Sequence, residues 1–427
     1  MSAPGTDRRA TWSWALYDFA NSAFTTLVVT FIYAAFFTKL MATDEITGTA
    51  LWSRGVTVTA VMVAGLSPFL GALADRGGYR KRFLAASTIV CVLATVALYF
   101  PEPGGDDAVI AIVIFVIGNV AFEMGGVFYN AFLPDVASPE KVGRVSGWGW
   151  ALGYVGGLLC MVIAFVALVF PDEPWLGFST AASQNIRATN LLVAVWFAIF
   201  AIPMFLFVKE ERPAERPHDI LRSTGRQLAE TFRSLKDYRQ IARLLIARLI
   251  YNDGLVTVFA FGGVYAAGTF GFDFDEILIF GIALNVTAGA GAFVMGFLDD
   301  KLGGKKTLLI TLVGLAAGTL LAALAPNREL FWVAGLTIGV FAGPNQSASR
   351  SLLARFVPPD KENEFFGFFA FSGKATAFLG PLLFGVLTQA FGTQRAGIFA
   401  VLVSFLVGGL LLMRVDEAEG VASKGDG

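Results

Sequence analysis

Long apolar runs separated by short polar segments dominate the chain. Each run reaches, with its flanks, the roughly 20 residues that an α-helix needs to cross a bilayer; examples are 27–37, 57–73, 108–120, 191–208, 308–324 and 398–413. A membrane β-barrel would instead alternate apolar and polar residues over strands of about 10 residues. The pattern therefore predicts an all-α membrane protein with twelve spanning helices, near 13–38, 51–74, 83–100, 108–132, 145–170, 190–208, 242–268, 276–298, 306–325, 329–354, 365–389 and 395–414.

Composition agrees with this prediction. The 427 residues are 56% hydrophobic and 15% charged, with a mean hydropathy of +0.66, whereas soluble proteins carry about 25% charged residues. Of the 32 Lys and Arg residues, 24 fall in the termini and even-numbered loops, 5 in the odd-numbered loops and 3 inside spans. Because cytoplasmic loops are enriched in cations, we expect both termini in the cytoplasm. The expected location is a bacterial inner membrane, with an equivalent organelle membrane as the alternative.

The longest polar connection divides the chain into two sets of six helices. The pattern predicts an N-terminal bundle over 1–208, a cytoplasmic linker over 209–241 and a C-terminal bundle over 242–427. Apolar residues recur at helical spacing within the linker, at Leu221, Leu228, Phe232 and Leu235. This spacing is typical of an amphipathic helix on an anionic leaflet, although a solvated linker helix fits as well.

The two halves repeat one sequence motif. An offset of 225 superposes the segment after the second span, GALADRGGYRKR, on the segment after the eighth, GFLDDKLGGKKT. The matched pairs are Gly71 with Gly296, Asp75 with Asp300, Arg76 with Lys301, Gly78 with Gly303, and Arg80 with Lys305. A second match, at an offset of 220, pairs Pro139, Lys141, Gly147 and Gly153 with Pro359, Lys361, Gly367 and Gly373. An even number of spans in each half makes the repeat parallel.

The duplicated motif suggests a gate. Its glycines permit tight turns and close helix approach, its aspartate can face the positive N-terminus of a neighbouring helix, and its cations are expected in the headgroup region. The pattern G-x-L-x-D-R-x-G-x-R-K resembles the signature of the major facilitator superfamily. That resemblance implies that Asp75 meets the helix beginning near Glu364, and Asp300 the helix beginning near Val145.

Further motifs narrow the resemblance. WALYDFANSAF (14–24), FYNAFLPD (128–135), RVSGWGWALGYVGG (144–157), GPNQSASRS (343–351) and FFGFFAFSGKATAFLGPLLFG (365–385) look like those of the vacuolar amino-acid effluxers connected with autophagy and their bacterial relatives. The resemblance covers the whole chain. A shared fold does not by itself transfer a cargo.

Polar residues inside the spans are the candidate site. Ionisable groups within a membrane are energetically costly, so each one is a candidate functional residue. At about 1.5 Å per residue, Asp18 lies about 7 Å and Arg350 about 6 Å from the cytoplasmic end, while Glu123 and Lys374 each lie about 15 Å deep. The substrate and coupling-ion candidates are Asp18, Asn21, Glu123, Asn130, Arg248, Asp253, Gln346, Arg350 and Lys374. Two interpretations stay open: these charges pair and hold a closed state together, or they bind a zwitterion or small polar solute and a proton.

These observations predict a secondary active transporter working by alternating access, with amino acids as the first candidate substrate and protons or sodium as the coupling ion. We expect a monomer in a lipid bilayer, with no nucleic-acid partner. No phosphate-binding loop or His, Cys and acid cluster indicates a cofactor or metal. Gly147, Gly149, Gly153 and Gly157 lie in a span and indicate helix packing, not dinucleotide binding. The alternatives are a polytopic membrane enzyme, a channel, and a facilitator for sugars or other metabolites.

Overall fold

The structure is a computed structural model that describes residues 7–210, 224–225 and 238–423. All regular secondary structure in these ranges is helical. The first half contains α1 (Arg8–Ala23), η1 (Phe24–Phe31), α2 (Ile32–Phe36), η2 (Phe37–Met41), α3 (Glu45–Gly77), α4 (Arg80–Ala97), α5 (Ala108–Ala131), α6 (Leu133–Val136), α7 (Val142–Ala164), η3 (Phe165–Val169), η4 (Trp175–Gly177), η5 (Ala181–Ser183) and α8 (Gln184–Phe207). The second half contains α10 (Arg239–Phe270), α11 (Phe274–Leu302), α12 (Gly304–Leu324), α13 (Arg328–Phe356), α14 (Glu362–Lys374), α15 (Leu379–Phe391), α16 (Gln394–Met413) and α17 (Glu417–Ala422).

These helices form the predicted twelve crossings. In the first crossing α1 runs on through η1, α2 and η2, and in the eleventh α14 is followed by α15. Ten of the described helices are long and apolar enough to span a membrane by composition alone. The other two crossings are α4, which begins with three consecutive cations, and α13, which contains the polar run GPNQSASRS. The predicted linker helix, with Leu221, Leu228, Phe232 and Leu235, falls outside the described residues.

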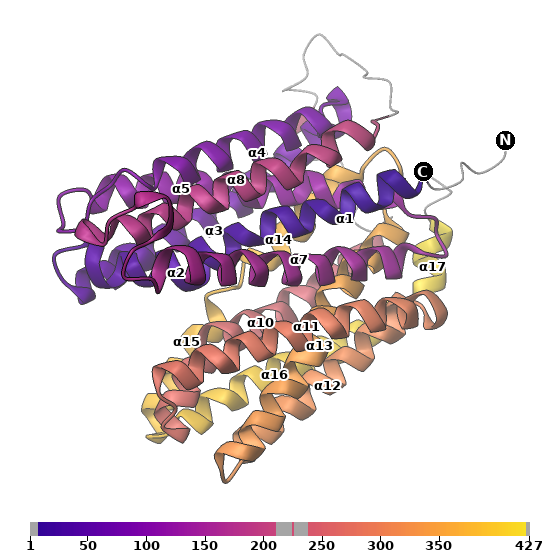
Figure 1. The fold of residues 1–427 in the computed structure, drawn as a ribbon. Coiled ribbons are helices and arrows are strands. Elements are labelled where there is room, and N and C mark those ends of the chain that lie inside the picture. Colours follow the sequence, from indigo (N-terminus) through magenta and orange to yellow (C-terminus); the bar gives the residue numbers. More distant parts are fainter. Residues whose placement is uncertain (1–6, 211–223, 226–237, 424–427) are drawn as a thin grey trace.

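The two halves are built alike and lie side by side (Figure 1). In the first half α1 packs on α8, α4 on α5, and α3 on α5. The second half repeats these pairs, with α10 on α16, α12 on α13, and α11 on α13. The same pairing at equivalent positions is what a parallel six-helix repeat requires.

The duplicated glycines lie where the halves meet. The main helix contacts between halves are α3 with α14 and α7 with α11. A Cβ at Gly71 would lie 2.2 Å from the carbonyl oxygen of Asn363, and one at Gly367 2.3 Å from that of Ser67. At the other contact, a Cβ at Gly147 would lie 2.4 Å from the carbonyl oxygen of Ala292. Only glycine allows such backbone contact, so both crossings depend on residues that the repeat pairs.

The eleventh crossing differs from its prediction. A continuous helix over 365–389 was expected, but α14 ends at Lys374 and α15 begins at Leu379. Side chains of α10 bind backbone carbonyls next to the break: Arg248 donates to Phe369 at 2.8 Å and Asn252 to Gly373 at 3.1 Å. A broken helix is tolerated in a membrane where protein groups satisfy its backbone in this way.

Candidate functional site

Both copies of the duplicated motif make a contact between the halves. Asp75 accepts the backbone N–H of Asn363 at 3.1 Å and that of Glu364 at 2.8 Å, at the start of α14. Asp300 accepts the backbone N–H groups of Gly143 and Arg144, at 2.9 and 3.2 Å, at the start of α7. Both contacts implied by the resemblance are therefore present, with each carboxylate at a positive helix N-terminus.

The other motif residues surround these contacts. Gly78 and Gly303 follow the ends of α3 and α11 with φ of 60° and 91°, a backbone conformation that favours glycine. Arg76 and Gly296 lie on the same two helices, Gly296 against the Cα atom of Arg144, and Lys301 is exposed. Lys305 donates to the carbonyl oxygen of Met413 at 3.1 Å.

Arg80 departs from its prediction. We expected the motif cations to face lipid headgroups, yet Arg80 is buried, with 2% of its surface exposed. It forms ion pairs with Asp135 and, at 3.0 Å, with Glu362 of the other half. It also donates to the carbonyl oxygen of Ala131 at 2.9 Å. Arg80 is therefore a further link between the halves, because a buried guanidinium is stable only when paired.

Asp18 and Arg350 form an ion pair across the halves. An oxygen of Asp18 lies 3.1 Å from Nη1 of Arg350, which also donates to Asn130 at 3.0 Å. Arg350 further donates to the hydroxyl of Ser146 at 2.9 Å and lies over the Trp14 ring, 4.8 Å from its centroid. This cluster draws on α1, α5, α7 and α13, and so connects both bundles.

Glu123 and Lys374 form a second ion pair, at 2.7 Å. Glu123 belongs to α5, and Lys374 is the last residue of α14, where a cation complements the helix dipole. Their side chains remain 23% and 32% exposed, unlike that of Arg350 at 3%. This pair is thus less buried than the pair of Arg350 and Asp18, whose side chains are 3% and 15% exposed.

The two candidate charges of α10, Arg248 and Asp253, do not pair with each other. Arg248 donates to Phe369 and to the hydroxyl of Ser372 at 2.9 Å, and lies 3.6 Å from the centroid of the Phe369 ring. Oδ1 of Asp253 is buried and has no hydrogen-bond partner among the described residues. A Cβ at Gly380, just after the break, would lie 2.9 Å from the other Asp253 oxygen. Asp253 therefore faces the interrupted helix.

A cleft of about 900 Å³ opens between the halves, at the end of the molecule away from the contacts of Asp75 and Asp300. Polar groups of both halves line it, including Ser22, Thr25, Thr26, Thr30, Trp150, Tyr154 and Asn285, with Lys39 and Glu45 at its mouth. Of the candidate residues of α1, neither Asp18 nor Asn21 belongs to this lining. Asn21 is buried and accepts the Ser22 hydroxyl at 3.5 Å. Gln346 is partly exposed on α13. The molecule is thus closed at the end carrying its termini and open at the other.

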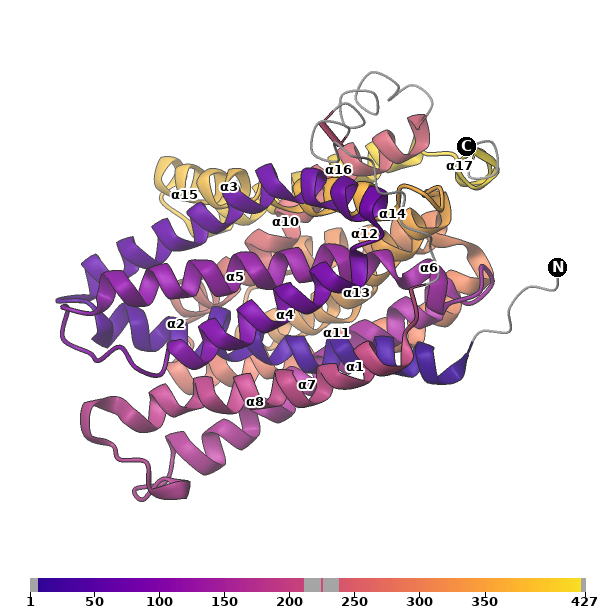
Figure 2. The same ribbon diagram turned by 90° about the horizontal axis from the view of Figure 1, so that it is seen from above.

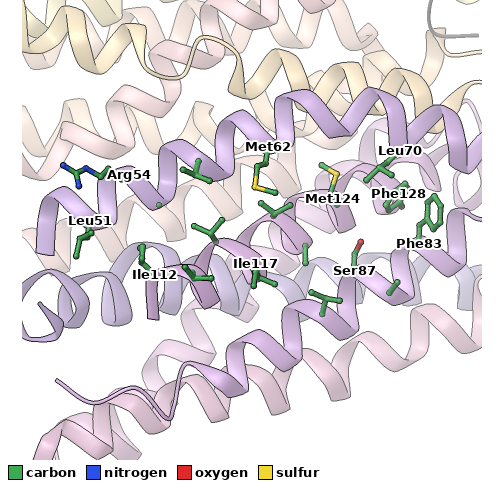
Figure 3. A pocket seen from close by; sticks show the side chains of 18 residues that line it. Leu51, Arg54, Met62, Leu70, Phe83, Ser87, Ile112, Ile117, Met124 and Phe128 are labelled. Carbon is green, nitrogen blue, oxygen red and sulfur yellow. The ribbon is translucent and has the colours of Figure 1, made fainter. Parts of the chain in front are cut away.

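A second large cavity, about 620 Å³, has different chemistry. It is a groove along α3, α4 and α5, lined by apolar side chains such as Met62, Ile117 and Met124, with Arg54 near one end (Figure 3). Several of its residues are exposed, Ile117 by 50%. Because an exposed apolar surface on spanning helices contacts lipid tails, we do not assign the transported solute to this groove.

Sequence reasoning missed some members of the site. Trp14 and Ser146 contact Arg350, and Asn252 donates to the carbonyl oxygen of Gly373, next to Lys374. All three are uncharged, and no spacing rule singles them out. Tyr129 was not among the candidates, yet it is 1% exposed and stacks on Trp14 with ring centroids 4.6 Å apart. The nearest signal in the sequence was the density of aromatic residues around Asp18.

Comparison with solved structures defines the class. The fold matches the proton:xylose symporter XylE with a TM-score of 0.74 at 12% identity, covering 96% of each chain. It matches the human organic anion transporter MFSD10 with a TM-score of 0.75 at 14% identity, covering 95% of this chain and 99% of that one. A third match is FucP in its outward conformation, with a TM-score of 0.74 at 12% identity over 96% and 98% of the chains. The fold is that of the major facilitator superfamily.

Sequence comparison gives the family. Residues 42–425 match the family model described as "Vacuole effluxer Atg22 like", and the chain belongs to this family. It is 27% identical over 408 residues to the uncharacterized MFS-type transporter YxiO of Bacillus subtilis, covering 95% of this chain and 94% of that protein. It is 21% identical to Autophagy-related protein 22 of Yarrowia lipolytica, over 86% and 75% of the two chains. The protein is a multi-pass membrane transporter of the major facilitator type, not an enzyme.

Proposed function

We propose that this protein moves amino acids across the membrane by secondary active transport with alternating access. The Glu123–Lys374 ion pair carries the proposal. It joins the two halves inside the bundle, is partly exposed, and presents one charge of each sign 2.7 Å apart. A free amino acid carries the same two charges, an ammonium and a carboxylate. The name of the family as vacuole effluxer is in keeping with an exported small solute.

The pair suggests a mechanism by exchange of partners. When a zwitterion enters, its ammonium can replace Lys374 on Glu123 while its carboxylate replaces Glu123 on Lys374. No charge is then left unpaired in a low-dielectric site, which would cost several kcal/mol. The exchange removes a direct link between α5 and α14, so substrate binding and loosening of the closed end become one event. A ligand shifts such an equilibrium only through its different affinity for the two states.

Asp253 is our candidate for the coupling ion. Its buried Oδ1 has no hydrogen-bond partner among the described residues, and interrupted helices in transporters border substrate and ion sites. A proton or a sodium ion could be taken up there. The excess of cations at the termini and even loops supports cytoplasmic termini. The similarity to YxiO of Bacillus subtilis supports a bacterial inner membrane as the location.

The test is uptake by purified protein in liposomes. A mixture of amino acids is offered with and without an imposed pH or sodium gradient, and the accumulated solute is identified by mass spectrometry. We expect amino-acid accumulation above equilibrium only with the gradient. Accumulation of a sugar or another metabolite instead would contradict amino acids as the substrate class. If the solute only equilibrates, with or without either gradient, the protein is a facilitator and not an active transporter. A matched thermal-shift screen ranks ligands, since a ligand at 100 times its Kd stabilises the state that binds it by about 2.7 kcal/mol.

A further inference from the structure

A separate basic pocket lies at the closed end of the first half. It has a volume of about 560 Å³ and is formed by the start of α1, the segment after α6 and the start of α7. Figure 2 shows α6 at the same end of the molecule as α17. The members used below are Arg8, Trp12, Lys141, Arg144 and Trp148. None of the substrate or coupling candidates belongs to it.

The pocket is cationic. Its described lining holds three cations and no acidic residue. Arg144 is paired with Asp300, whereas neither Arg8 nor Lys141 forms an ion pair with any acid in the described part of the chain. Arg8 at the start of α1 and Lys141 at the start of α7 place two unpaired cations beside one cavity, and an anion between them would reduce their repulsion.

Two tryptophans fix the level of the pocket. The rings of Trp12 and Trp148 stack with centroids 5.1 Å apart and planes 3° apart. Trp12 is 50% exposed, whereas Trp14 and Tyr17 of the same helix are buried. Exposed tryptophans on spanning helices lie at the headgroup level of a bilayer. The cations beside them therefore lie at the level of the lipid phosphates.

We propose that the basic pocket binds the phosphate of an anionic phospholipid from the leaflet on the side of the termini. A volume of 560 Å³ is ample for a glycerophosphate headgroup, and basic pockets of this kind suit anionic headgroups. The acyl chains would follow the exposed apolar surface next to Trp12. Free phosphate carries the same kind of charge, but it has no apolar part that would contact the exposed indole of Trp12.

The pocket shares one residue with the gate. Arg144 lines the pocket and also pairs through Nε with Asp300, which accepts two backbone N–H groups of α7 as well. A bound phosphate competes for the Arg144 side chain but leaves those backbone bonds intact. Anionic lipid is thus expected to weaken one of the two motif contacts, and this part of the inference rests on the proposed gating function.

The binding test uses the whole purified protein in detergent. Short-chain phosphatidylglycerol, phosphatidylcholine and inorganic phosphate are titrated separately, and binding is measured by native mass spectrometry and thermal shift. The double variant Arg8→Gln with Lys141→Gln is compared with the control Arg9→Gln with Lys306→Gln, which removes the same charge from exposed positions outside the pocket. We expect phosphatidylglycerol to bind the double variant about 30-fold more weakly, since each cation near an anionic surface contributes about fivefold.

Three results would overturn the site: equal weakening in the control, equal binding of phosphatidylcholine, or inorganic phosphate as effective as phosphatidylglycerol, which would indicate a free-anion site. Because lipid binding is measured without transport, its outcome does not depend on whether the proposed function is correct. The gating part is tested by labelling Ala260→Cys in the cleft, with and without phosphatidylglycerol in nanodiscs. Slower labelling with phosphatidylglycerol, lost in the double variant, is the expected result, and unchanged labelling would overturn the gating part alone.

Discussion

Asp75 and Asp300 make the same contact from opposite halves of the molecule. Each aspartate lies in the last turn of a helix of its own half, Asp75 in α3 and Asp300 in α11. Its carboxylate accepts two backbone N–H groups from the first turn of a helix in the other half. Both contacts are formed while the cleft at the other end is open. We propose that the two aspartates hold the closed end together from both halves, so that opening that end requires both contacts to break.

Asp75→Asn should shift the molecule away from this closed state. The change removes a charge–dipole interaction of about 0.3–2 kcal/mol, which corresponds to about a 2- to 30-fold change in population. The measurement is thiol labelling of Ala260→Cys, an exposed residue of the cleft, in a protein whose native Cys91 and Cys160 are both buried. Labelling should slow as the cleft closes more often.

The control is Asp44→Asn at the other end of the same helix. Asp44 is exposed and caps α3 by accepting the backbone N–H of Thr47 at 2.9 Å, which lowers the pKa of Asp44 below its ordinary value. Asparagine caps as well as aspartate, so labelling should not change there. If Asp75→Asn and Asp300→Asn both label at the parental rate, the motif has no gating role.

The Glu123–Lys374 pair should behave as a coupled unit. Glu123→Gln and Lys374→Met each leave one charge without its partner, so each should impair transport, while the double variant should lose less than the sum. We expect a coupling energy of about 0.5–3 kcal/mol from initial uptake rates and thermal stability. The control is Glu102→Gln, whose ion pair with Arg187 at 3.2 Å lies within the first half. Strictly additive losses would show that the observed pair has no part in transport.

Much of the fold follows from the sequence because membranes impose simple rules. Twelve apolar runs give twelve crossings, and the offset between Asp75 and Asp300 gives the parallel repeat and the contacts between halves. The break after Lys374 was not predicted, although Pro381 in the first turn of α15 is a signal for it, because a proline cannot hydrogen-bond to the carbonyl four residues before it. The hydrogen bonds that Arg248 and Asn252 donate from another helix next to the break leave no such signal. Intrinsic helix preference carries no record of such partners.

The candidate charges could be found from the sequence because ionisable residues inside a membrane span are rare and costly. Which of them pair was only partly predictable. Depth along a helix matched Glu123 with Lys374, which the structure pairs. Depth does not give rotation about the helix axis, so Arg80 was expected at the headgroups and is buried instead. For Asp18 the sequence left both pairing and solute binding open, and in the structure Arg350 of the other half binds it.

Gly71→Ala tests the close contact between α3 and α14. The added methyl would lie 2.2 Å from the Asn363 carbonyl oxygen, so the helices must separate, and overpacking of this kind costs about 1–3 kcal/mol. Gly65→Ala on the same helix is the matched control, because nothing lies within 4 Å of its methyl. We expect slower labelling of Ala260→Cys in the first variant only. Equal behaviour of the two would mean that this crossing does not limit closure.

Asp253→Asn separates coupling from movement. If this carboxylate takes up the coupling ion, its amide should abolish accumulation driven by a pH or sodium gradient while exchange of substrate down its own gradient survives. Both modes are measured in the same liposomes, with Asn285→Asp, in the cleft, as a variant of opposite charge change. Retained accumulation in Asp253→Asn would assign coupling to another residue.

Asp18→Asn is the sharpest test of the polar start of α1. The change keeps the shape but leaves the buried guanidinium of Arg350, 3% exposed, without its carboxylate. Asn130, Ser146 and the Trp14 ring still hold Arg350, so the protein should fold with reduced stability. Because Asp18 and Arg350 belong to different halves, the closed end should also open more easily and accumulation per folded molecule should fall. The double variant Asp18→Asn with Arg350→Gln removes the unpaired charge and should recover stability. It should not recover accumulation, because the ion pair between the halves is still absent. A single variant that folds, binds and accumulates solute like the parent would instead reduce this ion pair to a passive contact and leave Glu123 and Lys374 as the charges that join the halves inside the membrane.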